Sequence, residues 1–222
     1  HPVPENSYGL TYGEHREYLE FSLDTHRELK KYCDEKGVVY SSSVWDVTSL
    51  REIIQLKPVL IKIPSATNTH IELLQIAFEE YPGEIHISLG MTTREEEQEL
   101  IKLAESSSRL KDVVLYACTS GYPIKAEEAC LLEVSRLKEC YGDKILGVGY
   151  SGHHNGIALD VAAYTLGAQF IERSFTLDRT QNGSGHVASL EPDGMRRLSH
   201  NLAEVGESLT WKSKEILNIE VP

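Results

Sequence analysis

The sequence predicts an α/β protein from the order of its segments, and the polar residues at the segment ends favour a (β/α)8 TIM-type barrel over an open, doubly wound sheet. Short apolar segments alternate with helical segments at intervals of roughly 20 to 35 residues, and each parallel crossover needs a helix-sized connection. The segments VVLYAC and ILGVGY are apolar on both faces, which is typical of a sheet covered on both sides. The segment ends are rich in Ser, Thr, Lys and His, as at the rim of a barrel, and no G-x-G-x-x-G or P-loop motif indicates a nucleotide-binding sheet.

The composition is that of a globular protein with one domain. The chain has 222 residues, 41% hydrophobic and 25% charged, which is enough to bury one sizeable core. The net charge of −12, with no run of Lys or Arg longer than a pair, argues against a nucleic acid or an anionic membrane as a partner. No apolar run approaches the ~20 residues of a membrane helix. The four cysteines show no metal-ligand spacing, so we expect buried thiols in a cytoplasmic protein.

Helices are predicted from apolar residues at helical spacing and from residues that start or stop a helix. In residues 22–36, Leu29, Tyr32 and Cys33 share one side, and Gly37 ends the helix. In residues 93–105, a threonine caps the helix and the acidic first turn suits the helix dipole. Further helices are expected over residues 48–55, 69–81, 125–141, 157–166 and 191–209.

Six strands are expected, fewer than the eight of a closed barrel. We therefore expect a barrel that is incomplete at its N-terminus, with two strand–helix units preceding His1, or else a smaller open sheet. Residues 1–13 are expected to form a flexible arm or loop, residues 14–209 the barrel domain, and residues 210–222 a C-terminal tail on the surface. The strands are predicted at residues 38–44, 59–63, 84–88, 112–118, 145–150 and 169–176.

Polar side chains gather where these strands end, and rigid strands can aim such side chains at one point. Lys62 interrupts the apolar run VLIKIPS; it either reaches water from an edge strand or holds an ammonium group at the barrel mouth for an anionic substrate. Six residues with hydroxyl groups lie at or just past the ends of predicted strands. Each of them alone is typical of a turn, but together with Lys62 they would offer hydrogen-bond donors to a phosphate or carboxylate group. The set is Ser43, Ser65, Ser88, Thr119, Ser120 and Ser151.

The stretch 145–192 holds most of the ionisable candidates. A neutral imidazole at a strand end binds a divalent metal or acts as an acid or base near neutral pH, although a loop histidine is more often a surface residue. Glu172 and Arg173 are neighbours in a strand, so only one of them can face a barrel interior. Tyr122 is either a rim aromatic or a packing residue. The remaining candidates are His153, His154, Ser174, Asp178 and His186.

Several long motifs, in order, resemble the sialic acid synthase (N-acetylneuraminate synthase) family over nearly the whole chain. The resemblance implies a (β/α)8 barrel that condenses phosphoenolpyruvate with N-acetylmannosamine, or its 6-phosphate, to give a sialic acid and phosphate. It also implies a divalent metal, Mn or Mg, and a homodimer in which a C-terminal antifreeze-like domain, not expected in this chain, reaches the partner's active site. The motifs are GLTYGEHREYLEFS (9–22), VLIKIPS (59–65), ISLGM (87–91), ACTSGYP (117–123), VGYSGH (148–153) and FTLDRTQNGSGHVASLEP (175–192).

The resemblance also assigns roles by position. His153 resembles a metal ligand, and the metal would orient and polarise the aldehyde of the sugar. His153 and Lys62 are the expected catalytic residues. Ser120 and Tyr122 resemble contacts to the aminosugar, and Ser43 resembles a threonine that binds phosphoenolpyruvate. The other residues that resemble phosphoenolpyruvate-binding positions are Lys62, Ser65, Ser88 and Ser151.

Two positions depart from the family pattern. Ser174 stands where E-[KR]-H-[FI]-T has a second histidine ligand, and serine is a poor metal ligand. Gly185 stands where G-[PS]-D has a carboxylate near the sugar; His154 or His186 are the candidates to compensate. These departures leave two alternatives to an active synthase of this specificity. One is a catalytically weakened ligand-binding or regulatory barrel, and the other is a synthase for a related nonulosonic acid.

Overall fold

The protein folds into a curled parallel sheet, a half-barrel of five strands with helices on its outer side. The computed structural model describes residues 7–181, 183 and 185–221. The strand order is β1-β2-β3-β4-β5, and each neighbouring pair is parallel, so every connection is a crossover through a helix or loop. The strands are Leu60–Ile63 (β1), Glu84–Ser88 (β2), Val113–Cys118 (β3), Gly147–Gly152 (β4) and Phe170–Arg173 (β5).

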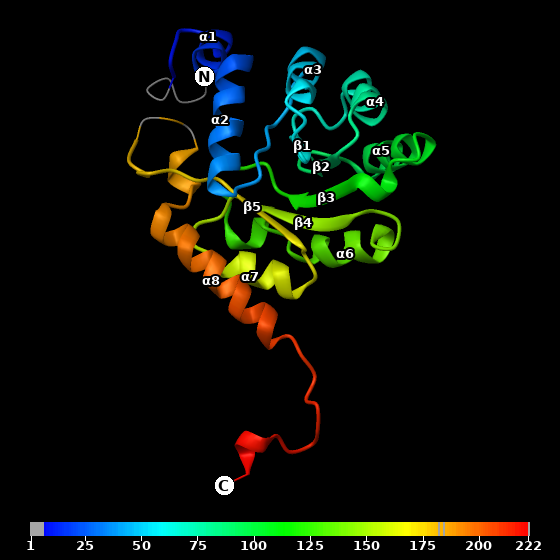
Figure 1. Cartoon of the computed structure of the whole chain (residues 1–222), viewed down its shortest axis with the longest axis vertical. Coiled ribbons are helices and arrows are strands. Elements are labelled where there is room, and N and C mark those ends of the chain that lie inside the picture. Colours follow the sequence, from blue (N-terminus) through cyan, green and yellow to red (C-terminus); the bar gives the residue numbers. More distant parts are fainter. Residues whose placement is uncertain (1–6, 182, 184, 222) are drawn as a thin grey trace.

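The helices follow one another around the outside of the strands, from α3 through α7 (Figure 1). Hydrogen bonds from backbone N–H groups to the side chains of Thr11, Ser22, Asp46 and Thr93 fix the starts of α1, α2, α3 and α5. The helices are Tyr12–Leu19 (α1), Leu23–Lys36 (α2), Val47–Gln55 (α3), Ile71–Glu80 (α4), Arg94–Ser106 (α5), Leu132–Tyr141 (α6), Ala158–Thr165 (α7) and Pro192–Ser208 (α8).

The two faces of the sheet differ in chemistry because side chains alternate along each strand. On the convex face, Ile61, Ile87 and Leu115 are completely buried in the apolar core against the surrounding helices. On the concave face, register pairs Lys62 with His86, and Ser151 with Glu172. The apolar core therefore lies between sheet and helices, and the polar residues of the strands collect inside the curl.

The structure corrects two of the predicted elements. The strand predicted at residues 38–44 is reduced to one bridge between Ser43 and Lys62, and Val38 and Val39 are exposed. The helix predicted at residues 125–141 is shortened to α6, preceded by a 3-10 turn at Ala126–Glu128. Cys130 interrupts it with a φ of 45°, a left-handed value that a regular helix does not contain.

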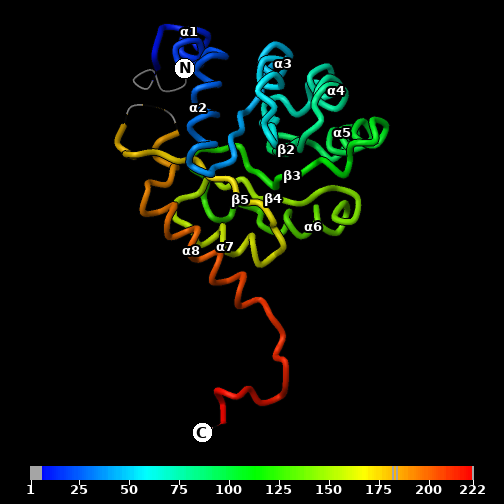
Figure 2. Tube along the Cα trace, viewed as in Figure 1, coloured from blue at the N-terminus to red at the C-terminus, as the bar shows by residue number. Residues whose placement is uncertain are grey.

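The ends of the chain lie apart from the curl. Residues 1–6 of the predicted arm lie outside the described residues, and α1 begins at Tyr12. After α8 the chain leads away from the half-barrel (Figure 2), so the described part of the tail, residues 210–221, does not lie on the surface of the half-barrel, and Trp211 is 97% exposed. No helix in the described part of the chain combines the length and the apolar composition that crossing a membrane requires.

Candidate active site

The concave face brings together four side chains from four strands. Lys62 on β1 donates from Nζ to Ser88 Oγ on β2 over 2.6 Å and to Glu172 Oε1 on β5 over 3.1 Å. Ser151 on β4 donates from Oγ to the same Glu172 Oε1 over 2.8 Å. Only 8% of Lys62 is exposed, so its ammonium does not reach out to bulk water as an edge lysine would. We name these four residues the lysine cluster.

The lysine cluster borders a cavity of about 220 Å³. Its walls include Lys62, Glu172 and residues 41–43. Ser43 pairs with Lys62 of β1 in a parallel bridge and therefore lies at the same cavity. Ser41 contributes a buried hydroxyl that has no hydrogen-bond partner among the described residues. A cation, free hydroxyls and open space beside them are what an oxyanion needs in order to bind.

His153 extends the lysine cluster beyond the end of β4. Its Nδ1 lies 2.8 Å from the carbonyl oxygen of Thr119, which can only accept, so Nδ1 carries the proton and Nε2 presents its lone pair. This Nε2 lies 3.5 Å from Ser151 Oγ, and the ring lies 4.2 Å from that of Tyr122, centroid to centroid. Burial lowers the pKa of His153, so the imidazole is neutral at pH 7.

Of the three other predicted hydroxyls, Thr119 Oγ1 donates to the carbonyl oxygen of Glu128 over 2.7 Å, and those of Ser65 and Ser120 lie together at the rim, in a notch beside Gly90. The backbone N–H of Gly90 donates to Ser65 Oγ over 3.0 Å, and Ser65 donates to Cys118 Sγ over 3.6 Å. The Oγ of Ser120 is buried without a hydrogen-bond partner among the described residues. A Cβ at Gly90 would lie 2.2 Å from Ser120 Oγ and 2.7 Å from Ser65 Oγ, so any side chain here would require both hydroxyls to move. No hydrogen bond among the described residues joins Ser65 or Ser120 to the lysine cluster.

Sequence reasoning missed three residues of the concave face. It left open which of two neighbours faces inward, and the structure selects Glu172. It did not single out His86 or Tyr116, whose imidazole Nδ1 and hydroxyl lie 2.8 Å apart in the interior. The signal was present in the alternation of E-I-H-I-S, where His86 shares a face with Ser88.

Arg173, the neighbour of Glu172, points to the opposite face and enters a buried network. Its Nη1 donates to Asp160 Oδ2 over 2.5 Å and to the carbonyl oxygen of Gly156 over 2.8 Å. His154 Nε2 lies 3.3 Å from the same Asp160 oxygen, and Nδ1 lies 3.3 Å from the hydroxyl of Tyr150. Both nitrogens of His154 are therefore engaged, and this residue does not compensate for a missing ligand.

The described residues do not make up a metal site. No group of three or more His, Cys, Asp or Glu side chains in the described part of the chain is arranged to share an ion. His153 offers one nitrogen, whereas Ser174 is exposed and its carbonyl oxygen accepts a hydrogen bond from Leu190. One imidazole does not fit a resident Mn or Mg, which takes several oxygen or nitrogen ligands.

The loop after β5 also lacks the carboxylate that the family pattern has. Gly185 is exposed, and a Cβ there would meet no atom within 4 Å, so the structure gives no steric reason for glycine; Ser184 lies outside the described residues. His186 Nδ1 lies 2.7 Å from Thr176 Oγ1, and Asp178 binds Thr180, so both serve the loop itself.

Comparison with known proteins assigns this arrangement to a family. The model described as NeuB family matches residues 3–214. The chain is 34% identical over 218 residues to the N-acetylneuraminate-9-phosphate synthase of Homo sapiens, covering 98% of this chain and 59% of the relative. It is 36% identical over 198 residues to the enzyme of the same name from Drosophila melanogaster, covering 89% of this chain and 52% of the relative.

The fold agrees with that of a solved relative. The crystal structure of an N-acetylneuraminic acid (sialic acid) synthetase from Leptospira borgpetersenii superposes with a TM-score of 0.85 at 24% identity, covering 96% of this chain and 73% of the other. The chain spans little more than half the length of the two curated relatives. The family match nevertheless extends over nearly all of its sequence, and the chain belongs to the NeuB family.

Proposed function

We propose that the chain carries the phosphoenolpyruvate site of a synthase that condenses this anion with N-acetylmannosamine, or its 6-phosphate, to give a sialic acid and phosphate. The observation that carries the proposal is Lys62, whose buried ammonium lies beside a cavity and donates to the hydroxyl of Ser88, while the hydroxyl of Ser151 donates to the same Glu172 oxygen as the ammonium. An ammonium with flanking hydroxyls binds phosphate and carboxylate groups through charge-assisted hydrogen bonds. We infer that further strand–helix units would complete this half-barrel to a (β/α)8 barrel. The curl of the sheet and the likeness to a solved synthetase structure support this inference.

The lysine cluster also supports a sequence of events. Glu172 now accepts hydrogen bonds from Lys62 and Ser151, in the place that an anion would take. When the anionic substrate binds these donors, Glu172 gives them up and becomes a base next to the substrate. The enol carbon attacks the aldehyde carbon of the sugar, and the aldehyde oxygen takes up a proton from solvent to become a hydroxyl. Water adds to the oxocarbenium carbon that develops and passes one proton to Glu172. The hydroxyl left on this carbon gives its proton to the departing phosphate as the carbon–oxygen bond to phosphate breaks, which leaves the keto group of the product.

Turnover tests the proposal directly. The purified chain is incubated with phosphoenolpyruvate, manganese chloride and either sugar, and released phosphate and product mass are measured. We expect phosphate release that requires the sugar, and a product whose mass equals both substrates plus water minus phosphate. Release without sugar, or product formation unchanged by Lys62→Met, would contradict it.

A binding barrel without turnover is the second candidate, and it is favoured by the exposed Ser174, which stands where the family pattern has a second histidine ligand. Calorimetry separates the two candidates. Tight phosphoenolpyruvate binding without turnover, unchanged in Ser174→His, supports a binding role, whereas turnover gained by Ser174→His with added manganese supports a weakened synthase. A panel of N-acylated sugars then tests the third candidate, a synthase for a related nonulosonic acid.

A further inference from the structure

The aromatic ring of Tyr116, on β3, lies beside the ammonium of Lys62 on the concave face. The Nζ of Lys62 lies over this ring at 5.1 Å from its centroid, within the range over which a cation is attracted to an aromatic face. Only 5% of Tyr116 is exposed, so little water weakens the contact. Both residues line the cavity that the lysine cluster borders. The ring and Glu172 therefore approach the same ammonium from two different strands.

The sheet leaves a place for this ring on β4. Tyr116 and Gly149 are register partners on β3 and β4. A Cβ at Gly149 would lie 2.5 Å from two carbon atoms of the ring, so the ring occupies the space that a side chain would take at this position. A glycine inside a strand often marks such a close approach. The position of the ring is thus set by the backbone of the neighbouring strand.

The hydroxyl of Tyr116 is anchored from β2. His86 Nε2 lies 3.2 Å from Glu84 Oε2, a carboxylate oxygen that accepts, so Nε2 carries the proton and Nδ1 presents its lone pair. The hydroxyl lies 2.8 Å from this Nδ1 and donates to it. Burial lowers the pKa of His86 and raises the pKa of Tyr116, so the imidazole is neutral and the hydroxyl is protonated at pH 7. The ring is therefore fixed both at its face and at its hydroxyl.

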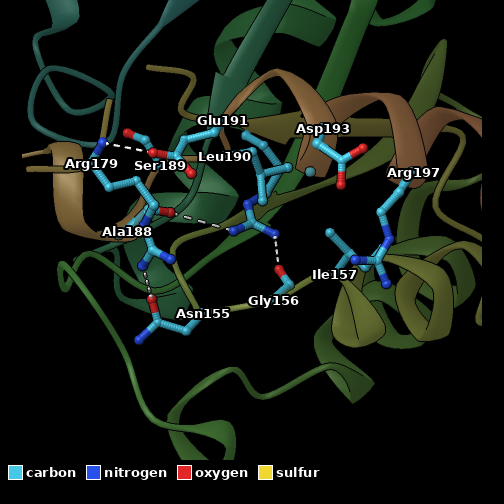
Figure 3. Close-up of a pocket in the computed structure, with 12 residues that line it drawn as sticks. Asn155, Gly156, Ile157, Arg179, Ala188, Ser189, Leu190, Glu191, Asp193 and Arg197 are labelled. Atoms are coloured by element: carbon cyan, nitrogen blue, oxygen red, sulfur yellow. Dashed lines mark hydrogen bonds between the residues drawn. The ribbon is translucent and has the colours of Figure 1, made fainter. Parts of the chain in front are cut away.

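Glu172 is not a lasting partner for Lys62 in the proposed sequence of events, because it gives up the ammonium when the anion binds. Its neighbour Arg173 donates to the carbonyl oxygens of Gly156 and Ala188, two residues that Figure 3 labels, so the end of β5 is held in place. The exchange then moves the Glu172 side chain and not the strand. The ammonium needs another contact if it is to stay where the anion binds.

We propose that Tyr116 is a positioning residue, whose ring keeps the ammonium of Lys62 at the cavity when an anionic substrate displaces Glu172. This assignment rests on the proposed function, because it takes phosphoenolpyruvate as the anion that Lys62 binds. Ser88 holds the ammonium through one hydrogen bond, and the ring adds a contact that does not depend on Glu172. The anion then meets a cation that is already in place, and less side-chain freedom is lost on binding.

A double-mutant cycle tests whether Tyr116 acts through Lys62. Phosphoenolpyruvate binding is measured by calorimetry with the wild type, Tyr116→Leu, Lys62→Met and the double variant. We expect Tyr116→Leu to weaken binding by roughly threefold to tenfold, the cost of ordering one long side chain, but by less than about twofold in the Lys62→Met background. Tyr116→Phe keeps the ring over Gly149, so its affinity should lie within about twofold of the wild type.

Tyr81→Leu is the matched control. Tyr81 is also buried, its hydroxyl donates to the carbonyl oxygen of Pro58, and it lies in the apolar core outside the lysine cluster. This variant should lose melting temperature, as Tyr116→Leu does, and keep an affinity for phosphoenolpyruvate within about twofold of the wild type. If Tyr116→Leu does not yield folded protein, Tyr116→Met, with its more adaptable side chain, takes its place in the cycle.

Three results would overturn the assignment. These are unchanged affinity in Tyr116→Leu, an equal loss in the wild-type and Lys62→Met backgrounds, and a loss in Tyr116→Phe as large as in Tyr116→Leu. An equal loss in both backgrounds would mean that the ring only supports the fold. If Lys62→Met loses phosphoenolpyruvate binding in any of these cases, only the role of Tyr116 fails. If Lys62→Met retains phosphoenolpyruvate binding, the proposed function itself fails.

Discussion

Replacing Lys62 by methionine separates the binding role of this residue from any structural role. Methionine keeps a side chain of similar length over the ring of Tyr116, where the ammonium now lies 5.1 Å from the ring centroid. A hydrogen bond to a charged group contributes about 1.5–3 kcal/mol, so losing the ammonium should cost about 2–3 kcal/mol of phosphoenolpyruvate binding. This corresponds to an affinity loss of roughly 30- to 160-fold.

The same substitution should have little effect on folding. Lys62 pairs with Glu172 over 3.0 Å, but the Glu172 side chain is 39% exposed and stays hydrated when its partner is removed. A partly exposed pair contributes about 0–1 kcal/mol, which corresponds to a melting-temperature change within about 4 °C for a chain of this size. A drop well beyond this value would show that Lys62 is primarily structural.

Calorimetry with phosphoenolpyruvate and thermal unfolding measure the two quantities on one protein sample. Lys102→Met on α5 is the matched control, because Lys102 is exposed and lies outside the cluster. An affinity of Lys62→Met within about twofold of the wild type, as for Lys102→Met, would refute the reasoning that the buried ammonium binds the anion.

Two further predictions concern the concave face. Burial lowers the pKa of His86 by more than the neighbouring Glu84 raises it. The imidazole therefore stays neutral in the folded state, whereas it takes up a proton below about pH 6.5 in the unfolded state. The free energy of unfolding therefore decreases as pH falls from about 7 towards the lowered pKa. The melting temperature of His86→Gln should fall less steeply with pH over this range than that of the wild type, and equal slopes in the two proteins would contradict the prediction. A Cβ at Gly149 would lie 2.5 Å from the ring of Tyr116, so Gly149→Ala should lower the free energy of unfolding by about 1–3 kcal/mol in denaturant titrations. No change in that free energy would show that the ring can move aside.

Local patterns predicted most of the fold. The alternation of apolar and helical segments gave the α/β class, and five of the six predicted strands are present. The strand at residues 38–44 was overestimated because Val38 and Val39 read as apolar strand residues, yet no neighbouring strand covers them in the described structure. The helix at residues 125–141 was overestimated because residue spacing does not reveal the left-handed backbone at Cys130.

The site was only partly predictable. The sequence by itself placed Lys62, Ser88, Ser151 and His153 at strand ends, because residue type and position relative to a strand are local properties. Only the tertiary structure decided that Glu172 faces inward, since that depends on the register of β5 against β4. Only the curl of the sheet brings Glu172 within 3.0 Å of Lys62, 110 residues away in the chain, because β1 and β5 are at opposite edges of the strand order.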